Sequence, residues 1–331
     1  MVCNLMKTST KPLGSLSLDL DNQWSYMKTH GDGGWQSFPS YLDIVVPRVL
    51  DFFRQRNLTL TFFVVGQDAA LDQNRAALRA LSDAGHEIGN HSFSHEQWLH
   101  LYTEQQIEDD LSRAEAHIER VTGQKLTGFR GPGYSFSRAT LEVLKRRSYT
   151  FDASTFPTYL GPLARMYYFA TAKLSLEEKR ERAKLFGTLQ DGLRPTKPFR
   201  WQLDAGELLE IPVTTMPVFK IPFHASYILY LSLYSRALAM LYYRWALGMC
   251  RWRGVQPSLL LHPLDFLGGD DIKELSFFPA MRVPSAKKLD VMSEILRLYT
   301  TNFNVVTMRQ HAEACLQDAH LPQMKPSAMA S

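Results

Sequence analysis

This sequence has few cysteines and no large excess of positive or negative charge, and each of these facts excludes a class of protein. The three cysteines, Cys3, Cys250 and Cys315, are odd in number and far apart. We therefore expect no disulfide framework and a reducing compartment. Lysine and arginine number 37 against 33 acidic residues, and no basic stripe accompanies this small excess. The sequence does not predict a nucleic-acid-binding protein.

Long apolar runs are also missing. The opening residues, MVCNLMKTSTKPLG, lack the apolar core of a secretory leader, which favours a cytoplasmic protein. Segment 225–250 is apolar, but Arg236 and Arg244 interrupt it before the roughly 18 residues that a spanning helix needs. Its amphipathic stripe, which predicts a helix packed on the core, is Tyr227, Leu231, Tyr234, Leu238, Leu241 and Trp245. A helix lying peripherally against a membrane or a lipid-linked substrate is the alternative.

What the sequence does contain is a regular alternation of short β-branched or aromatic runs with helical patterns. Strands are expected over 15–20, 58–65, 86–90, 125–130, 149–154, 208–214, 257–262 and 303–308. Helices are expected over 40–56, 72–84, 103–122, 137–147, 225–250 and 285–301. This alternation predicts an α/β protein with a largely parallel sheet, and seven or eight βα units in one run favour a single-domain, distorted (β/α)7–8 barrel.

The expected barrel occupies residues 15–318, after a lead-in at 1–14 and before a disordered tail at 319–331. Residues 173–200 are densely charged and predict a surface insertion, as a solvated helix or alternatively as a lid or an oligomer contact. A homo-oligomer is the expected assembly.

Two carboxylates end the first expected strand, in the sequence SLDLDNQW. Asp19 and Asp21 are two positions apart, so in an extended chain their side chains point to the same side. Two neighbouring carboxylates mostly repel each other, and a cation between them removes that cost. The pair therefore raises the question of a metal site.

The sequence HEIGNHSFSHEQW places His91 and His95 four positions apart, directly after an expected strand. On a helical turn this spacing puts both imidazoles on one face, where they can bind one divalent ion. Exposed helices carry such pairs by accident, but this pair follows a strand, at the edge where barrels keep their active sites. Two histidines and one carboxylate would leave an open position for water, and a second carboxylate could take its proton.

Two further motifs follow expected strands. In GFRGPGYSFS, Arg130 leaves a strand, and the loop up to Tyr134 could direct a backbone N–H toward developing negative charge. A Gly/Pro turn with a surface arginine is the alternative. In LLLHPLDF, an apolar strand ends on His262, which is well placed as a general acid, with a core histidine as the alternative.

In this order, the motifs D-x-D, H-x-x-x-H, R-x-P-x-Y and L-x-x-H resemble those of the polysaccharide deacetylases (carbohydrate esterase family 4, NodB-homology proteins) over residues 15 to about 265. The resemblance implies a distorted (β/α) barrel and a metal-dependent hydrolase that removes an N-acyl group, usually N-acetyl, from a sugar. It also implies an N-acylated amino sugar as substrate, in a glycan or on a nucleotide or lipid carrier. The implied cofactor is a divalent metal, first zinc, with cobalt, nickel or iron as alternatives.

The resemblance also implies roles for single residues of this sequence. Four are expected to carry out the chemistry: Asp19 as base, Arg130 to hold the base carboxylate, the Tyr134 backbone amide as oxyanion donor and His262 as the acid that protonates the leaving amine. Three are expected to bind the metal: Asp21, His91 and His95. Leu260 is expected to line the pocket for the acyl methyl group.

Two departures from the family pattern matter. The usual first motif has adjacent aspartates, whereas Leu20 separates them here, a variant that resembles the peptidoglycan-deacetylase-like and allantoinase-like branch. The aspartate–tryptophan motif, whose acid tunes the final histidine, is not recognisable. Asp152 and Asp265 are the candidates for that support.

The loop after the first strand, NQWSYMKTHGDGGWQSF, is rich in aromatic residues. Aromatic faces suit the C–H faces of sugars, so part of this loop is expected to bind substrate, with packing as the alternative. The residues concerned are Trp24, Tyr26, His30 and Trp35.

Three other functions stay open. A hydrolase of a non-sugar C–N bond would suit the allantoinase-like resemblance. A deformylase of a lipid-linked sugar would suit the basic helix 225–250 with Arg251 and Arg253. A carbohydrate-binding protein without catalysis is disfavoured, because every expected catalytic residue is present.

Overall fold

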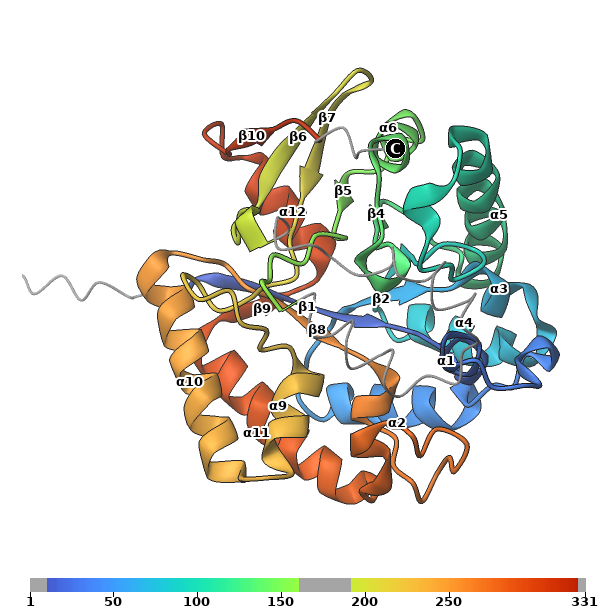
Figure 1. Ribbon diagram of the computed structural model, residues 1–331, viewed down its shortest axis with the longest axis vertical. Helices are drawn as coiled ribbons and strands as arrows, with labels where there is room; N and C mark the ends of the chain where they lie inside the picture. The colour runs from blue at the N-terminus through green and yellow to red at the C-terminus, as the bar shows by residue number, and fades with distance from the viewer. Residues whose placement is uncertain (1–10, 161–191, 327–331) are drawn as a thin grey trace, which may run out of the picture.

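Ten strands form one sheet in the part of the chain that the computed structural model describes, residues 11–160 and 192–326 (Figure 1). The strand order is β10-β6-β7-β5-β4-β3-β2-β1-β8, with β9 paired to β1. Seven parallel strands form its centre: β1 (Leu13–Asp19), β2 (Thr61–Val64), β3 (Glu87–Asn90), β4 (Gly128–Phe129), β5 (Phe151–Asp152), β7 (Gly206–Glu210) and β8 (Ser258–Leu261). The remaining strands are β6 (Phe199–Leu203), antiparallel to β7, and two parallel additions, β9 (Asn304–Val306) and β10 (Gln323–Met324).

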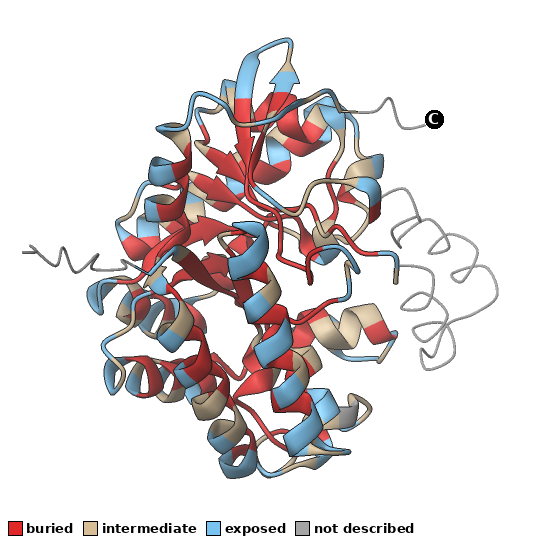
Figure 2. Cartoon of the chain, turned by 90° about the vertical axis from the view of Figure 1, so that its left-hand side faces the viewer, coloured by how far each residue is buried: buried red, intermediate tan, exposed pale blue. Residues whose placement is uncertain are grey.

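Helices connect the strands and pack around the sheet (Figure 1). Those in the first half of the chain are α1 (Gln23–His30), α2 (Leu42–Arg54), α3 (Gly66–Ala70), α4 (Arg75–Asp83), α5 (Glu104–Thr122) and α6 (Arg138–Arg146). Those in the second half are α9 (Ala225–Ser232), α10 (Arg236–Arg253), α11 (Ser285–Asn302) and α12 (Met308–Leu316). Buried residues concentrate in the sheet and on the inner sides of the helices (Figure 2).

The sheet curves into a distorted (β/α) barrel, which confirms the predicted fold class. The chain continues beyond β7, and there the Thr214 N–H donates to the Ser258 carbonyl of β8 (3.3 Å). The Ser258 N–H in turn donates to Thr214 Oγ1 (2.7 Å). These two bonds connect the segment after β7 to β8. In an ideal barrel a regular ladder of hydrogen bonds would connect them, so the barrel is distorted at this point.

Strand β1 shows how the sequence divides the barrel into two environments. Alternate residues point to opposite faces of a strand. Leu16 and Leu18 belong to the main core together with Val45 of α2, whereas Ser17 and Asp19 accept hydrogen bonds from a buried arginine. The polar side of β1 therefore faces the inside of the barrel, and both aspartates follow that side toward the end of the strand.

A smaller apolar cluster fills the barrel between the strands and α12. It contains Phe63, Phe151, Leu209, Met308, Ala312 and Cys315, among others. All eight predicted strand positions and five of the six predicted helices are present, with shifted ends. The sequence prediction missed α1, α3, α12, β6 and β10, because these are short elements or lie where another pattern was expected.

The predicted domain limits need two corrections. Strand β6 begins at Phe199, inside the predicted insertion 173–200, and the remainder of that insertion up to residue 191 lies outside the described residues. The predicted disordered tail contains β10, which pairs with β6 at Gln323 and Arg200. A tail of this composition gains order here because an open sheet edge offers it backbone partners.

The helix predicted over 225–250 is two helices, and the predicted buried stripe is not buried. Helix α10 starts after Ser235, whose side chain caps it. Four stripe residues are largely exposed: Tyr234 (76%), Leu238 (66%), Leu241 (52%) and Trp245 (68%). The buried side is Ala239, Met240, Tyr243, Ala246, Leu247 and Cys250. Both sides of α10 are apolar, so periodicity alone chose the wrong one. No helix within the described ranges is long and apolar enough to cross a bilayer.

Buried His311 on α12 predicts a loss of stability in acid. Its Nδ1 lies 2.9 Å from Ser15 Oγ, and burial lowers the pKa of His311 from 6.5 to about 4. Because the unfolded chain takes up this proton first, the free energy of unfolding should fall by about 3 kcal/mol between pH 6.5 and 4. Urea unfolding across this range should give a shallower decline for His311→Gln, and equal slopes would exclude His311 as the cause.

Candidate metal centre and catalytic groups

The ends of four parallel strands bring the predicted motifs to one edge of the barrel. Asp19 ends β1, His91 follows β3, Arg130 follows β4 and His262 follows β8. Strands β1, β2, β3 and β4 are neighbours, and β8 pairs with β1 on its other side. Because parallel strands present their carboxyl ends at the same edge, residues more than 200 positions apart in the sequence meet in one site.

Asp21, His91 and His95 form a three-donor cluster. Asp21 Oδ1 lies 3.3 Å from His91 Nε2 and 2.8 Å from His95 Nε2. One ligand atom from each of the three buried residues lies within 4.8 Å of the others. Two imidazole nitrogens and one carboxylate oxygen are a donor set suited to zinc and similar divalent ions. The cluster is a possible metal site, as the sequence predicted.

The electrostatics of the cluster favour a charged carboxylate. Burial alone would raise the pKa of Asp21, but the His95 and His91 rings outweigh burial and hold this pKa well below its usual range. For His91, burial acts to lower the pKa, while the charges of Asp19 and Asp21 raise it above its ordinary value. The two histidine rings therefore stabilise the charged form of Asp21. A divalent cation bound between the three side chains would do the same.

The contact behind His91 fits a metal-ligand role. His91 Nδ1 lies 2.6 Å from the Arg130 carbonyl, an acceptor only, so Nδ1 carries the proton and Nε2 presents its lone pair. His95 Nδ1 is buried and has no hydrogen-bond partner among the described residues. Both Nε2 atoms face Asp21, which is the arrangement that a shared ion requires.

The two histidines lie in a loop and not on the helical turn that their spacing predicted. Ser92 and His95 both have positive φ angles, 60° and 49°. Asp110 of α5 holds the loop from outside: its two carboxylate oxygens accept from the Phe93 N–H (2.8 Å) and the Ser94 N–H (3.1 Å). The sharp turn, pinned by Asp110, brings the imidazoles together in place of helical geometry.

Arg130 ties the base candidate to the strands around it. The guanidinium is fully buried, and its Nη1 donates to Asp19 Oδ1 (2.7 Å) and to Ser17 Oγ (2.9 Å). Its Nε donates to the Ala153 carbonyl (3.0 Å), and its plane lies over the Phe63 ring. The main-chain carbonyl of Arg130 also contacts His91 Nδ1. Arg130 therefore positions both the base candidate, Asp19, and a metal-ligand candidate, His91.

Tyr134 lies at the site, but its backbone amide is already engaged. In the turn that follows β4, the Tyr134 N–H donates to the Gly131 carbonyl (2.9 Å). Its ring packs against Phe156, with ring centroids 4.7 Å apart. A tight turn at positions 131–134 therefore engages this N–H internally, and its role as an oxyanion donor stays a prediction.

His262 is partly exposed at the end of β8 and is held from two sides. Its Nδ1 lies 3.1 Å from Ser226 Oγ, and its backbone N–H donates to Asp265 Oδ2 (2.8 Å). Burial raises the pKa of Asp265, against the lowering effect of the nearby His262. Of the two predicted supports, Asp265 thus contacts His262 directly.

Asp152, the other predicted support, belongs to a different pair. It lies opposite Glu210 in the β5–β7 register, and its Oδ1 accepts from Ser154 Oγ (2.6 Å). Burial, and then the charge of Asp152, raise the pKa of Glu210 well above its usual range. Trp201 and Thr155 donate to the Glu210 carboxylate. This buried pair lies between β5 and β7, and among the described residues Asp152 has no hydrogen bond to His262.

The aromatic residues predicted to bind a sugar are mostly engaged in the protein. Trp24 is 1% exposed, and its indole Nε1 donates to Asp68 Oδ1 (2.9 Å). His30 is also buried, bonded to Asp32 and stacked on Phe277.

The structure therefore contradicts the prediction that Trp24 and His30 offer ring faces to a sugar, because helix α1 turns both side chains inward. Trp35 is half-buried and Leu260 is fully buried on β8 beside Ser17. For these two residues substrate binding stays a prediction.

Sequence reasoning missed His224 and gave Tyr26 a different role. His224, directly before α9, is buried with its ring 5.9 Å from that of His262. Burial, and then the charges of His262 and Arg130, lower the pKa of His224. Tyr26 hydrogen-bonds Asp21, and after burial the charges of Asp21, Tyr41 and Asp265 raise its pKa. The signal for His224 is a histidine shortly before a predicted helix. Tyr26 was expected to bind a sugar, and its contact with Asp21 was not predicted.

Sequence comparisons agree with this geometry. Residues 32–151 match the family model of polysaccharide deacetylases, and this match contains both histidines of the cluster. The chain is 32% identical over 112 residues to a peptidoglycan deacetylase of Helicobacter pylori, covering 34% of this chain and 37% of that protein. It is 38% identical over 104 residues to the peptidoglycan-N-acetylmuramic acid deacetylase of Bacillus subtilis, covering 31% and 38%. The chain spans about two fifths of the length of these curated relatives.

The fold has a solved counterpart. A crystal structure of a candidate polysaccharide deacetylase from Mycobacterium smegmatis superposes with a TM-score of 0.62 and 20% sequence identity. The superposition covers 96% of this chain and 94% of that chain. At this identity the likeness establishes the fold over nearly the whole chain, beyond the part matched by the family model.

Proposed function

We propose that this chain, which resembles the polysaccharide deacetylases over residues 32–151, hydrolyses the N-acetyl group of an amino sugar. One observation carries the proposal: the Asp21, His91 and His95 donors lie beside a buried Asp19–Arg130 pair at the mouth of the barrel. The two curated relatives are described as acting on peptidoglycan, so an N-acetylated glycan is the first substrate class to test.

Asp21, His91 and His95 are proposed to hold a divalent metal. The proposal is supported by their donor chemistry and by the Arg130 carbonyl, which leaves His91 Nε2 free as a ligand. The ion would supply a Lewis acid that polarises the amide carbonyl and makes water nucleophilic near neutral pH. Zinc suits two imidazoles and one carboxylate best, and cobalt, nickel and iron are the next ions to test.

Asp19 is proposed as the base that takes the proton of the attacking water. Arg130 engages its Oδ1, which orients the carboxylate and leaves Oδ2 to accept a proton. Asp19 itself remains outside the three-donor cluster. The two carboxylates of β1 thus have separate tasks.

His262 is proposed as the acid that protonates the leaving amine. Ser226 at Nδ1 and Asp265 at the backbone N–H fix the ring, so that Nε2 can donate a proton. The neighbouring His224 has a lowered pKa because of burial and nearby positive charge, which favours the neutral form of its imidazole. No covalent bond between protein and substrate is needed.

The test is the release of acetate and formate from a panel of substrates. The panel contains N-acetylated glycan oligomers, including peptidoglycan fragments, and nucleotide-linked and lipid-linked N-acylated sugars. We expect acetate from at least one N-acetylated sugar and none with Asp19→Asn. Formate alone from a lipid-linked sugar, or hydrolysis only of an allantoin-like compound, would replace this proposal with a different hydrolase.

A further inference from the structure

A set of exposed apolar residues on α10 and just before it has no role in the proposed chemistry. It consists of Tyr234, Leu238, Leu241, Trp245 and Trp252, which we call the α10 outer face. Trp252 is 74% exposed and the others are similarly open. The helical positions 238, 241, 245 and 252 are separated by three, four and seven residues, so these side chains share one side of α10. Much of α10 is exposed in Figure 2, which views the side of the molecule that carries it.

The charged residues of the segment that carries the α10 outer face all have one sign. Segment 225–254 contains four arginines and no aspartate or glutamate. Arg244 and Arg251, seven positions apart, lie along one border of the face, and Arg253 lies on the other border. Arg251 bonds the neutral amide of Asn302, and Arg253 lies over the Trp252 ring, so neither contact cancels the charge.

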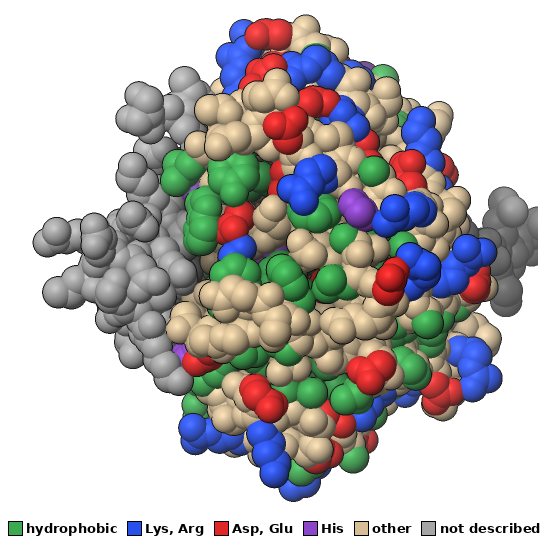
Figure 3. All heavy atoms as spheres, turned by 90° about the vertical axis from the view of Figure 1, so that its right-hand side faces the viewer, with side chains coloured by type: hydrophobic (Ala, Val, Ile, Leu, Met, Phe, Trp, Pro, Cys, Tyr) green, Lys and Arg blue, Asp and Glu red, His purple; other side chains and the backbone are tan. Residues whose placement is uncertain are grey.

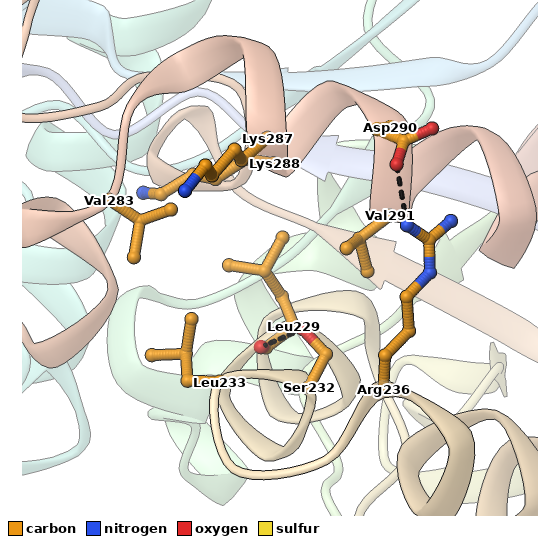
Figure 4. Close-up of a pocket in the computed structure, with 9 residues that line it drawn as sticks. All are labelled: Leu229, Ser232, Leu233, Arg236, Val283, Lys287, Lys288, Asp290 and Val291. Carbon is orange, nitrogen blue, oxygen red and sulfur yellow. Dashed lines mark hydrogen bonds and ion pairs between the residues drawn. The ribbon is translucent and has the colours of Figure 1, made fainter.

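Arg236 differs from these three arginines because it is neutralised within the protein. Its guanidinium pairs with Asp290 and Glu294 of α11. Figure 4 shows this arginine directed toward Asp290, at the end of a groove of about 210 Å³ between α9 and α11. This pairing fixes the start of α10 on the body of the protein, while Arg244, Arg251 and Arg253 remain available to an external anion.

The opposite side of the molecule has an ordinary surface. On the side that carries α1, α3 and α5, basic and acidic side chains are interspersed (Figure 3). Ion pairs there include Arg147 with Glu108 and Glu115. The acid-free border of the α10 outer face is therefore a local feature, and not a consequence of the net charge of +4.

We propose that the α10 outer face docks on a bilayer that contains anionic lipids. Leucines and tryptophans at the centre of an exposed helix face, with arginines at its borders, match a helix lying in the membrane interface. The three arginines complement anionic headgroups. A second copy of the same face would oppose arginine to arginine with no acid available in the segment, so self-association is disfavoured.

Docking would also bring the catalytic edge close to the lipid surface. Helix α9 starts beside the site, where Ser226 contacts His262, and spans about 12 Å before it meets α10. This consequence rests on the proposed function, but docking itself does not.

Vesicle co-sedimentation of the full chain tests the proposal. The protein should bind vesicles that contain phosphatidylcholine and phosphatidylglycerol. It should bind vesicles of phosphatidylcholine alone at least about tenfold more weakly. Raising the salt from about 0.05 to about 0.5 M should weaken binding. Leu238→Asp/Leu241→Asp should lower the partition coefficient at least about tenfold, and Arg244→Gln/Arg251→Gln should remove most of the salt dependence.

The matched control is Leu101→Asp, since Leu101 is 54% exposed against 52% for Leu241 but belongs to the short turn Leu99–Leu101 and not to α10. It should bind as the wild type does, and thermal melts should show that all variants are folded. Three results would each overturn the proposal: no binding to anionic vesicles, binding unaffected by the leucine variant, or a wild-type dimer that the leucine variant dissociates. Acetate release from a soluble sugar is measured separately, so a failure of docking and a failure of the proposed activity are distinguishable.

Discussion

Replacing Asp19 by asparagine is expected to lower the rate of acetate release about a thousandfold. The substitution removes the proposed proton acceptor, while the amide oxygen can still accept the hydrogen bond of Arg130 Nη1. Since Asp19 is outside the cluster of Asp21, His91 and His95, affinity for a divalent ion should change by less than about tenfold. Acetate release and ion titration on the same protein preparation measure both quantities.

The matched control for this prediction is Asp51→Asn on the exposed side of α2, where the carboxylate contacts Arg54 and Gln55 on the same surface. It loses the same charge and should keep full activity. If Asp19→Asn keeps wild-type activity, Asp19 is not the base. If it loses the ion together with activity, Asp19 is a ligand and the assignment of the two aspartates must be exchanged.

Replacing Arg130 by glutamine is expected to have the second-largest effect, on stability as well as activity. Both Arg130 and Asp19 are buried, and their oxygen and nitrogen atoms lie 2.7 Å apart. Without the guanidinium, the Asp19 carboxylate remains buried and uncompensated, a situation that costs about 3–5 kcal/mol. Urea unfolding should therefore show a large loss, and acetate release should fall as well because the base is no longer held.

The double variant Asp19→Asn/Arg130→Gln separates the charge from the packing. It removes both members of the pair, so no uncompensated charge remains. We expect it to be at least about 1 kcal/mol more stable than Arg130→Gln alone. If the double variant is instead less stable than Arg130→Gln, the loss arises from packing around Phe63 and Ala153, and the Asp19–Arg130 pair is not the main cause.

The strand ends of the site were predictable from the sequence because their chemistry is local. The two-residue spacing of Asp19 and Asp21 predicts a common side of β1, and the apolar runs before His91 and His262 predict strand ends. Parallel packing then assembles the residues. The spacing of His91 and His95 correctly predicted that the two side chains lie together, but it predicted a helical turn where the structure has a loop. The conformation of that loop depends on Asp110 of α5, which the local sequence does not contain.

Other features depend on contacts that no local pattern contains. The Tyr134 amide is engaged by a turn, and Trp24 is drawn inward by Asp68, which follows the next strand. Helix α10 is apolar on both sides, so periodicity could not choose the side that packs against α11. His224 reaches His262 only through the path of the chain before α9. In each case the deciding partner is remote in sequence.

One measurement tests the central claim most directly, namely that Asp21, His91 and His95 hold a divalent ion on which deacetylation depends. Wild-type protein is stripped with a chelator, and acetate release is then followed while zinc is titrated back. Activity should vanish on stripping and return with an end point of about one ion per chain, while Asp21→Ala should neither bind the ion nor recover. Full activity of the stripped protein, or wild-type ion affinity in Asp21→Ala, would contradict the account.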